Sequence, residues 1–223
     1  KLLKYPGKEL ELFDKAILWR KYLFFSTERF FGKKILEVGA GIGSFTEIYK
    51  KDDLDITVSE VDSLNYKILK QKFLKEKNIK IKCKFTKEFK KKFDTILYMS
   101  VLEHIKDDTQ EIKMAISKLK KNGHLIICVP ARNYMYSSFD KEIGHYRRYE
   151  ISFFKRLKTK KSKIIKCYLL DSMGELIYFV NKLVFSKEKY PSKMKIFIWD
   201  KIFIPFTFFL DFLSFYKFGK NII

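Results

Sequence analysis

The chain has 223 residues, 47% of them hydrophobic, and a formal net charge of +21. The length allows one substantial α/β domain and is short for two, and the hydrophobic content excludes a largely disordered chain. Only six of the 47 basic residues are arginine, so lysine carries the excess positive charge. These lysines could be dispersed over the solvated surface or could form a surface that binds a polyanion.

Neither the N-terminus nor the cysteines point to an oxidising compartment. The chain starts at Lys1 with no charged-then-apolar leader, which predicts a cytoplasmic protein. Cys83, Cys128 and Cys167 each lie in an apolar run, and their spacing matches no metal site. We therefore expect buried, reduced thiols and no bound metal.

The first predicted element is a helix over residues 9–31, where apolar and aromatic residues recur at helical spacing. Short apolar runs then alternate with helical stretches. The expected strands are 34–38, 54–60, 79–85, 94–99 and 124–129, and the expected helices lie near 43–51, 63–76 and 107–121. Asn122-Gly123 is expected to end the last of these helices. The alternation predicts right-handed βαβ crossovers and a parallel sheet with helices on both faces.

Beyond residue 150 the chain becomes more aromatic. We expect a strand over 163–170, helices over 174–185 and 193–216, and the start of a final strand near the C-terminus. The apolar stretch 202–210 is too short to cross a bilayer and is flanked by charged residues, which predicts a packed or interfacial helix.

A glycine-rich loop, Gly39-Ala40-Gly41-Ile42-Gly43, follows the first expected strand and precedes a helix. Glycine lets the backbone turn sharply and approach a ligand, and a helix N-terminus offers unpaired N–H groups to an anion. The spacing is G-x-G-x-G, whereas a dinucleotide loop reads G-x-G-x-x-G. The loop therefore predicts a nucleotide-like ligand and does not require a pyrophosphate.

Two carboxylates accompany this loop. Glu60 ends the second strand, where a carboxylate can accept hydrogen bonds from both ribose hydroxyls; Asp62 is the alternative ligand, and a solvated strand end is the alternative role of Glu60. Glu37 lies between Leu36 and Val38 and needs a donor or cation, because an unpaired buried carboxylate is costly.

A second motif follows further along the chain. It reads Phe93-Asp-Thr-Ile-Leu-Tyr-Met-Ser-Val-Leu-Glu-His104. Together with Glu37–Gly43 and Glu60, this stretch resembles class I S-adenosylmethionine-dependent methyltransferases, over residues 10–171. The resemblance implies a Rossmann-like, doubly wound sheet of seven mostly parallel strands with helices on both faces. It also implies an N-terminal helix and a helical aromatic insertion before the last strand.

The resemblance also implies a division of the chain and a cofactor site. One domain, 1–223, would comprise an N-terminal helical cover (1–32), a cofactor-binding core (33–171), a substrate-side aromatic insertion (172–217) and the start of the last strand (218–223). The residues implied to bind S-adenosylmethionine, or its product S-adenosylhomocysteine, are Glu37, Gly39, Ala40, Gly41 and Gly43 at the methionine part, Glu60 and Val61 at the ribose, and Met99, Ser100 and His104 in the pocket. Relatives place a polar residue after the third strand for adenine, where this chain has Phe85-Thr86-Lys87.

The segment 130–149 is expected to select the acceptor, because ligands of such sheets bind outside the carboxyl ends of the strands. It holds Arg132, Arg147 and Arg148 and five aromatic residues. Arginine in a lysine-rich chain indicates planar bidentate contacts, either to substrate or to Asp140 or Glu142. Residues 140–149 also resemble a subgroup from bacterial glycan and lipid-linked sugar pathways.

A hydroxyl acceptor usually needs a base, and His145 is the candidate, since histidine titrates near neutrality. Tyr146, Arg147 and Arg148 are the neighbouring candidates for substrate contact. A structural role for His145 is the alternative.

The sequence thus predicts a methyltransferase that acts by in-line displacement on a hydroxyl, or an amine or carboxyl, of a small or lipid- or glycan-linked metabolite. The aromatic 174–216 region could cover the substrate or rest on a membrane surface, and ordinary packing is the alternative. A basic RNA-binding or RNA-modifying protein of the same fold is the alternative function; Pro-Pro and Pro-Cys pairs of base-modifying enzymes do not occur. A cofactor-binding protein without activity is a third hypothesis.

Overall fold

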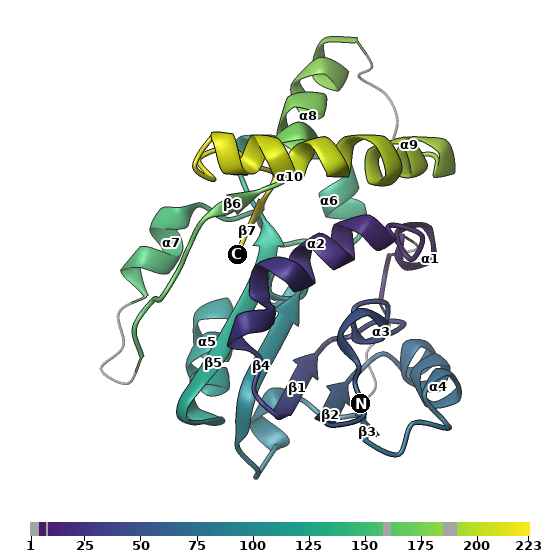
Figure 1. Cartoon of the computed structure of the whole chain (residues 1–223), viewed down its shortest axis with the longest axis vertical. Coiled ribbons are helices and arrows are strands. Elements are labelled where there is room, and N and C mark those ends of the chain that lie inside the picture. Colours follow the sequence, from purple (N-terminus) through teal and green to yellow (C-terminus); the bar gives the residue numbers. More distant parts are fainter. Residues whose placement is uncertain (1–4, 8, 158–161, 185–190) are drawn as a thin grey trace. The chain divides into compact units, whose positions relative to one another are not determined.

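The computed structural model describes residues 5–7, 9–157, 162–184 and 191–223, and within them the chain forms a seven-stranded sheet of order β3-β2-β1-β4-β5-β7-β6 (Figure 1). The strands are β1 (Lys34–Val38), β2 (Asp55–Ser59), β3 (Ile79–Lys82), β4 (Phe93–Met99), β5 (Leu119–Pro130), β6 (Leu169–Leu170) and β7 (Asn221–Ile222). β1 is parallel to β2 and β4, β2 is parallel to β3, and β7 is antiparallel to β5 and β6. The predicted α/β class with a mostly parallel sheet is confirmed.

The chain divides into two compact units that are both discontinuous in sequence. The first unit comprises Lys1–Pro6 and Leu23–Ile127, and the second comprises Gly7–Tyr22 and Cys128–Ile223. Residues 1–4 of the predicted 1–32 cover, its residue 8, and residues 185–190 of the predicted 172–217 insertion lie outside the described residues.

The first unit has its core on the central strands. Ile35, Leu36, Ile96 and Leu97 are fully buried. Such continuous apolar runs are expected of parallel strands that are covered on both faces. The helices of this unit are α3 (Thr46–Tyr49), α4 (Ser63–Lys72) and α5 (Asp108–Ser117), with short 3₁₀ turns at Glu28–Phe30, Thr86–Glu88 and Leu102–His104.

One expectation about this unit is wrong. Asn122-Gly123 does not end a helix, because α5 already ends at Ser117 and the pair lies inside β5. Asn122 has a left-handed φ of 61° there, and a Cβ on Gly123 would lie 2.9 Å from the carbonyl oxygen of Asp94 in β4. The pair therefore permits a kink and a close backbone approach within the sheet.

The second unit is mainly helical. Its helices are α1 (Leu10–Phe13), α6 (Ser138–Glu142), α7 (Ile151–Arg156), α8 (Ser172–Val184), α9 (Lys193–Ile198) and α10 (Ile204–Leu213), with the π-helical turn η5 at Trp199–Phe203 and the 3₁₀ turn at Asn133–Met135. α2 (Ile17–Thr27) begins in the second unit and ends in the first. None of the described helices is long and apolar enough to cross a bilayer.

Three predicted elements of this part have different bounds. The single helix 9–31 is interrupted between Phe13 and Ile17. The strand 163–170 shortens to its last two residues, which pair with Ile222 and Asn221 of β7. The helix 193–216 ends at Leu213, since Phe215 and Tyr216 have positive φ angles of 52° and 57°. The N-terminal helices and the helical stretch between β6 and β7 otherwise occur in the predicted order.

Candidate functional site

The glycine loop after β1 depends on conformations that favour glycine. Gly39, Gly41 and Gly43 have φ angles of 65°, 57° and 77°. A Cβ on Gly39 would lie 2.7 Å from Val101, and one on Gly43 would lie 2.6 Å from the Phe73 ring. The loop is tied to β2 because the N–H of Gly39 donates to the Ser59 carbonyl at 2.7 Å. Larger residues at 39 and 43 would therefore be excluded both by backbone strain and by contact.

Glu60 lies directly against this loop. Its Oε2 accepts the Gly41 N–H at 2.8 Å, and its Oε1 accepts the N–H groups of Val61 and Asp62 at 2.7 and 2.8 Å. Only 6% of the residue is exposed, and burial raises the pKa of Glu60 against the opposing effect of these three backbone hydrogen bonds. A carboxylate oxygen accepts about two hydrogen bonds, so Oε2 retains capacity for a ligand hydroxyl.

Asp62, the alternative ribose ligand, has a helix-capping role. Its Oδ1 accepts the N–H groups of Leu64 and Asn65 at 2.9 and 2.8 Å at the start of α4, and its Oδ2 accepts the Tyr5 N–H at 2.9 Å. This is the usual function of aspartate at an N-cap, and it leaves Glu60 as the carboxylate at the loop.

Glu37 is buried, and hydroxyl groups satisfy it. Its Oε2 accepts hydrogen bonds from Thr46 Oγ1 at 2.6 Å and from the Tyr49 hydroxyl at 2.7 Å, both on α3. Burial raises the pKa of Glu37 to about 7, although these two hydrogen bonds lower it. The sequence predicted that Glu37 needs a hydrogen-bond donor but did not identify the donor. The two hydroxyl residues that lie 9 and 12 positions further along the chain could have indicated it.

The remaining predicted cofactor residues follow β4. In the sheet register, Val38 pairs with both Ser59 and Tyr98, so the segments after β1, β2 and β4 start at one edge. Met99 is half-buried, Ser100 is exposed with a φ of 55°, and the His104 ring packs edge-on to Tyr5 with centroids 5.3 Å apart. Apart from Glu37, which lies in β1, the predicted cofactor residues therefore come from three adjacent segments after the strands of the first unit, where ligands of such sheets bind.

The region after β3 contributes packing contacts. Thr86 is buried, and its hydroxyl lies 2.8 Å from the Tyr98 hydroxyl, which donates to Glu111 at 2.6 Å. Phe85 is 42% exposed. The Thr86 hydroxyl is thus engaged by a contact within the protein.

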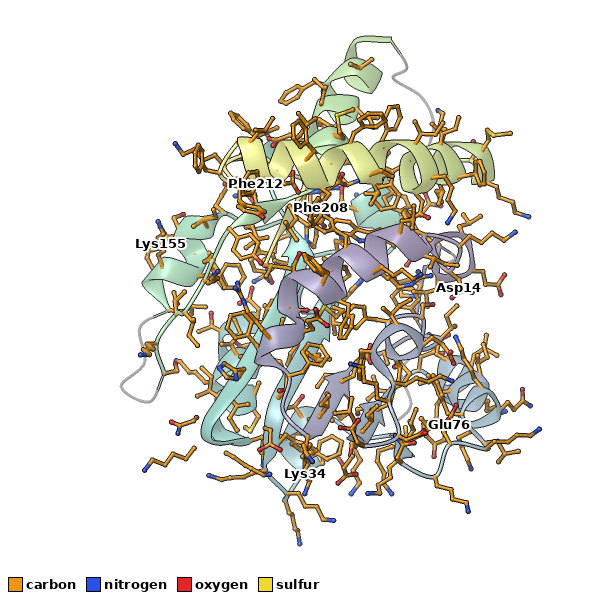
Figure 2. All side chains as sticks on the ribbon, in the orientation of Figure 1. Asp14, Lys34, Glu76, Lys155, Phe208 and Phe212 are labelled. Carbon is orange, nitrogen blue, oxygen red and sulfur yellow. The ribbon has the colours of Figure 1, made fainter. Side chains whose placement is uncertain are left out.

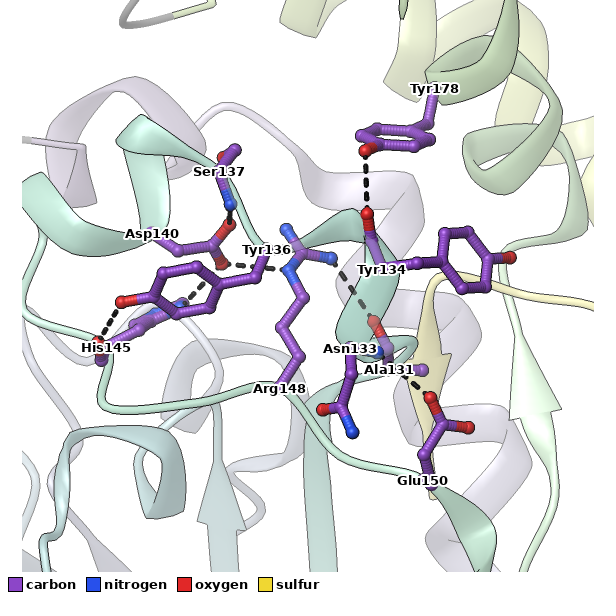
Figure 3. Close-up of polar contacts among 10 residues, drawn as sticks. All are labelled: Ala131, Asn133, Tyr134, Tyr136, Ser137, Asp140, His145, Arg148, Glu150 and Tyr178. Atoms are coloured by element: carbon purple, nitrogen blue, oxygen red, sulfur yellow. Dashed lines mark hydrogen bonds and ion pairs between the residues drawn. The ribbon is translucent and has the colours of Figure 1, made fainter.

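In the second unit, the acceptor segment is organised around Asp140 (Figure 3). This carboxylate is fully buried; its Oδ1 lies 2.9 Å from His145 Nδ1 and accepts Arg148 Nε at 2.9 Å, while its Oδ2 accepts the Ser137 N–H and hydroxyl. Burial opposes ionisation, but the hydrogen bond from His145 and the charge of Arg148 outweigh it and hold the pKa of Asp140 at about 2. Asp140 is therefore an anion at neutral pH.

The three arginines of this segment differ in their contacts. Arg148 also donates to the Ala131 carbonyl at 3.4 Å, and Arg132 forms an ion pair with Glu175 at 3.0 Å, so both make internal contacts of the kind that the alternative hypothesis predicted. Arg147 lies 5.9 Å from the ring centre of Tyr146, which is 56% exposed. Of the candidate contact residues, Tyr146 is exposed, whereas His145, Arg147 and Arg148 are half-buried.

Glu175 on α8 is a buried partner that sequence reasoning missed. Besides Arg132, it accepts the Tyr134 hydroxyl and the Gly219 N–H, the latter at 2.6 Å. Burial, together with the hydrogen bond to Glu175, raises the pKa of Tyr134 to about 12. Tyr178 donates to the Tyr134 carbonyl at 3.1 Å, which adds a second link between α8 and this segment (Figure 3).

The strand order, the glycine loop after β1 and the carboxylate after β2 define a Rossmann-like class I methyltransferase fold. A family model described as a methyltransferase domain matches residues 11–179. The chain belongs to this methyltransferase family, which uses S-adenosylmethionine, so the predicted family and cofactor are confirmed.

Individual relatives are distant. The ubiquinone biosynthesis O-methyltransferase of Pelagibacter ubique is 36% identical over 99 residues, which cover 42% of this chain and 40% of that protein. The structure of the YcgJ protein from Bacillus subtilis has a TM-score of 0.57 at 13% identity, and covers 77% of this chain and 86% of that one. The N-methyltransferase NodS from Bradyrhizobium japonicum, solved with S-adenosylhomocysteine, has a TM-score of 0.51 at 20% identity over 63% of this chain and 74% of that one.

Proposed function

We propose that this protein transfers the methyl group of S-adenosylmethionine to a hydroxyl group of a small or lipid- or glycan-linked metabolite. The family supplies the reaction type, and the partial match to an O-methyltransferase favours an oxygen acceptor over an amine or carboxyl. The observation that carries the hydroxyl acceptor is the buried contact between Asp140 and His145.

The residues around the glycine loop fit the cofactor. Oε2 of Glu60 retains acceptor capacity for a ribose hydroxyl, and the positive φ angles of Gly39 and Gly41 bring backbone rather than side chains to the loop surface. When bound, S-adenosylmethionine would supply an electrophilic methyl group on a sulfonium centre. The protein's own task would then be to align the acceptor and exclude water.

His145 is suited to remove the acceptor's proton. Because Asp140 is ionised, it can only accept a hydrogen bond, so the proton of the shared contact lies on His145 Nδ1. That tautomer leaves Nε2 as the basic nitrogen, as in other carboxylate-oriented histidines. The Tyr136 hydroxyl donates to the His145 carbonyl at 2.7 Å, a contact that holds the backbone at this residue. His145 Nε2 would accept the hydroxyl proton, with Arg147 and Tyr146 as candidate contacts to the acceptor.

Calorimetry with S-adenosylhomocysteine tests the cofactor half of the proposal. We expect saturable binding by the native protein and none by Gly41→Val, because a branched side chain would be strained at a positive φ. Leu74→Val, at a residue that is 80% exposed, is the control and should bind normally. No heat from the native protein, or unchanged binding by Gly41→Val, would reject the assigned site.

The acceptor half requires a screen. Release of S-adenosylhomocysteine would be measured over catechols, sugars and glycolipids with free hydroxyls, with the matching O-methylated compounds as controls. Turnover with a free hydroxyl and none with its methyl ether is the expected result. Turnover confined to amines would replace the hydroxyl with a nitrogen acceptor.

A further inference from the structure

The segment formed by α9, η5 and α10 has a polar buried side. Its buried residues recur every three or four positions and therefore share one face. They are Ile196, Asp200, Ile204, Thr207 and Asp211. Three of the five are polar, and the two aspartates have no exposed surface. An ordinary surface helix would bury its apolar side instead.

Both buried aspartates bind the N-termini of other helices in the second unit. Asp200 accepts the N–H groups of Leu18 and Trp19 at 3.2 and 2.9 Å, in the first turn of α2. Asp211 accepts the N–H groups of Asp171 and Ser172 at 2.9 Å, at the start of α8, and the Tyr22 hydroxyl at 2.9 Å. Carboxylates are favourable at helix N-termini, so the polar side of the segment is fixed inward.

The opposite side of α10 is apolar and open to solvent. Phe206, Phe209, Phe212 and Leu213 have exposed fractions of 60%, 59%, 65% and 53%. Their spacing places Phe206, Phe209 and Leu213 opposite the buried stripe and Phe212 to one side of it. Phe212 lies near the C-terminal end of the helix (Figure 2). We call these four residues the outer face of α10. Clustered exposed aromatic residues of this kind mark interaction surfaces.

The exposed charged side chains of residues 191–223 are all positive. Lys193, Lys195 and Lys217 are exposed, whereas Asp200 and Asp211, the only acidic residues in 191–223, are both buried. A segment that exposes an apolar helix face and whose exposed charged side chains are all lysines complements a surface that is apolar inside and anionic outside. A second copy of this chain would instead bring two positively charged segments together.

We propose that the outer face of α10 docks on the surface of a membrane that contains anionic lipids. The phenylalanines would enter the boundary between headgroups and acyl chains while the lysines contact the headgroups. Because Asp200 and Asp211 hold the opposite side of the helix to the protein, α10 would lie along the membrane surface. This binding does not depend on methyl transfer, and it would place the protein beside lipid-linked acceptors.

Flotation tests the proposal, using the whole chain with vesicles of equimolar phosphatidylglycerol and phosphatidylcholine, and with vesicles of phosphatidylcholine alone. The native protein should float with the mixed vesicles and bind pure phosphatidylcholine much more weakly. The triple variant Phe206→Ser/Phe209→Ser/Phe212→Ser should bind the mixed vesicles more weakly by about tenfold or more, because the inserted apolar area is lost. All three side chains are exposed, so circular dichroism and thermal unfolding should match the native protein.

Two charge variants test whether the exposed lysines of residues 191–223 matter more for binding than the overall positive charge of the protein. Lys193→Gln/Lys217→Gln should weaken binding to the mixed vesicles more than Lys141→Gln/Lys155→Gln, which removes two exposed lysines of α6 and α7. Equal flotation of the native and triple-serine proteins would overturn the proposal, as would no flotation of the native protein at low salt. A native dimer that the triple substitution converts to monomers, without vesicle binding, would assign the face to a second copy instead.

Discussion

Asp140 Oδ1 lies 2.9 Å from His145 Nδ1, and the Asp140 side chain has no solvent-exposed surface. The same oxygen accepts the Arg148 guanidinium, so one buried anion orients both the candidate base and an arginine of the acceptor segment.

Removing the imidazole should affect turnover rather than cofactor binding. We expect His145→Ala to lower kcat for a hydroxyl acceptor by about 10²- to 10⁴-fold, the usual contribution of a general base. Calorimetry should show unchanged affinity for S-adenosylhomocysteine. His124→Ala is the matched control, because His124 packs against Phe30 in the first unit and should keep native kcat. An active His145→Ala variant would assign His145 a structural role.

The low pKa of Asp140 should appear in acid stability. Its folded pKa of about 2 is below the ordinary value of 3.8, so its ionised form stabilises the folded state above about pH 4, and this contribution is lost as the pH falls toward 2. The shift corresponds to about 2 kcal/mol of unfolding free energy. Urea unfolding of native protein and Asp140→Asn should differ clearly at pH 6 and converge toward about pH 2. A constant difference across this range would contradict the prediction.

Glu37 should have the opposite pH dependence. Burial raises its folded pKa from 4.5 to about 7, so its protonated form is favoured in the fold, and that stabilisation is lost as the pH rises through this window. Glu37→Gln keeps an acceptor oxygen for Thr46 and Tyr49 but does not ionise. We expect the variant to gain up to about 3 kcal/mol over the native protein on going from pH 4.5 to pH 8. Parallel stability curves for the two proteins would show that Glu37 titrates normally.

Glu60 should determine cofactor affinity. Glu60→Gln removes a charged acceptor that contacts the Gly41 N–H at 2.8 Å, and we expect affinity for S-adenosylhomocysteine to fall by about 10- to 100-fold, as for loss of a charge-assisted hydrogen bond. Asp53→Asn, at an exposed position, is the control for a loss of one negative charge. If both variants bind like the native protein, the ribose ligand lies elsewhere.

Much of the first unit could be predicted because its signals are local. The first expected strand, 34–38, coincides with β1, and the glycine loop and Glu60 follow their strands as expected. The kink at Asn122-Gly123 could not be predicted, since the same dipeptide ends helices and bends strands, and its close neighbour Asp94 is far away in sequence. The Arg132–Glu175 pair likewise joins residues that no local pattern relates.

The contact between Asp200 and Leu18 has a consequence for biosynthesis. The two residues are 182 positions apart, yet the first turn of α2 depends on this carboxylate for its cap. A nascent chain leaving the ribosome would expose β1 to β4 long before Asp200 is translated. The first unit could therefore begin to fold during synthesis, whereas the start of α2 would wait for the late arrival of its cap.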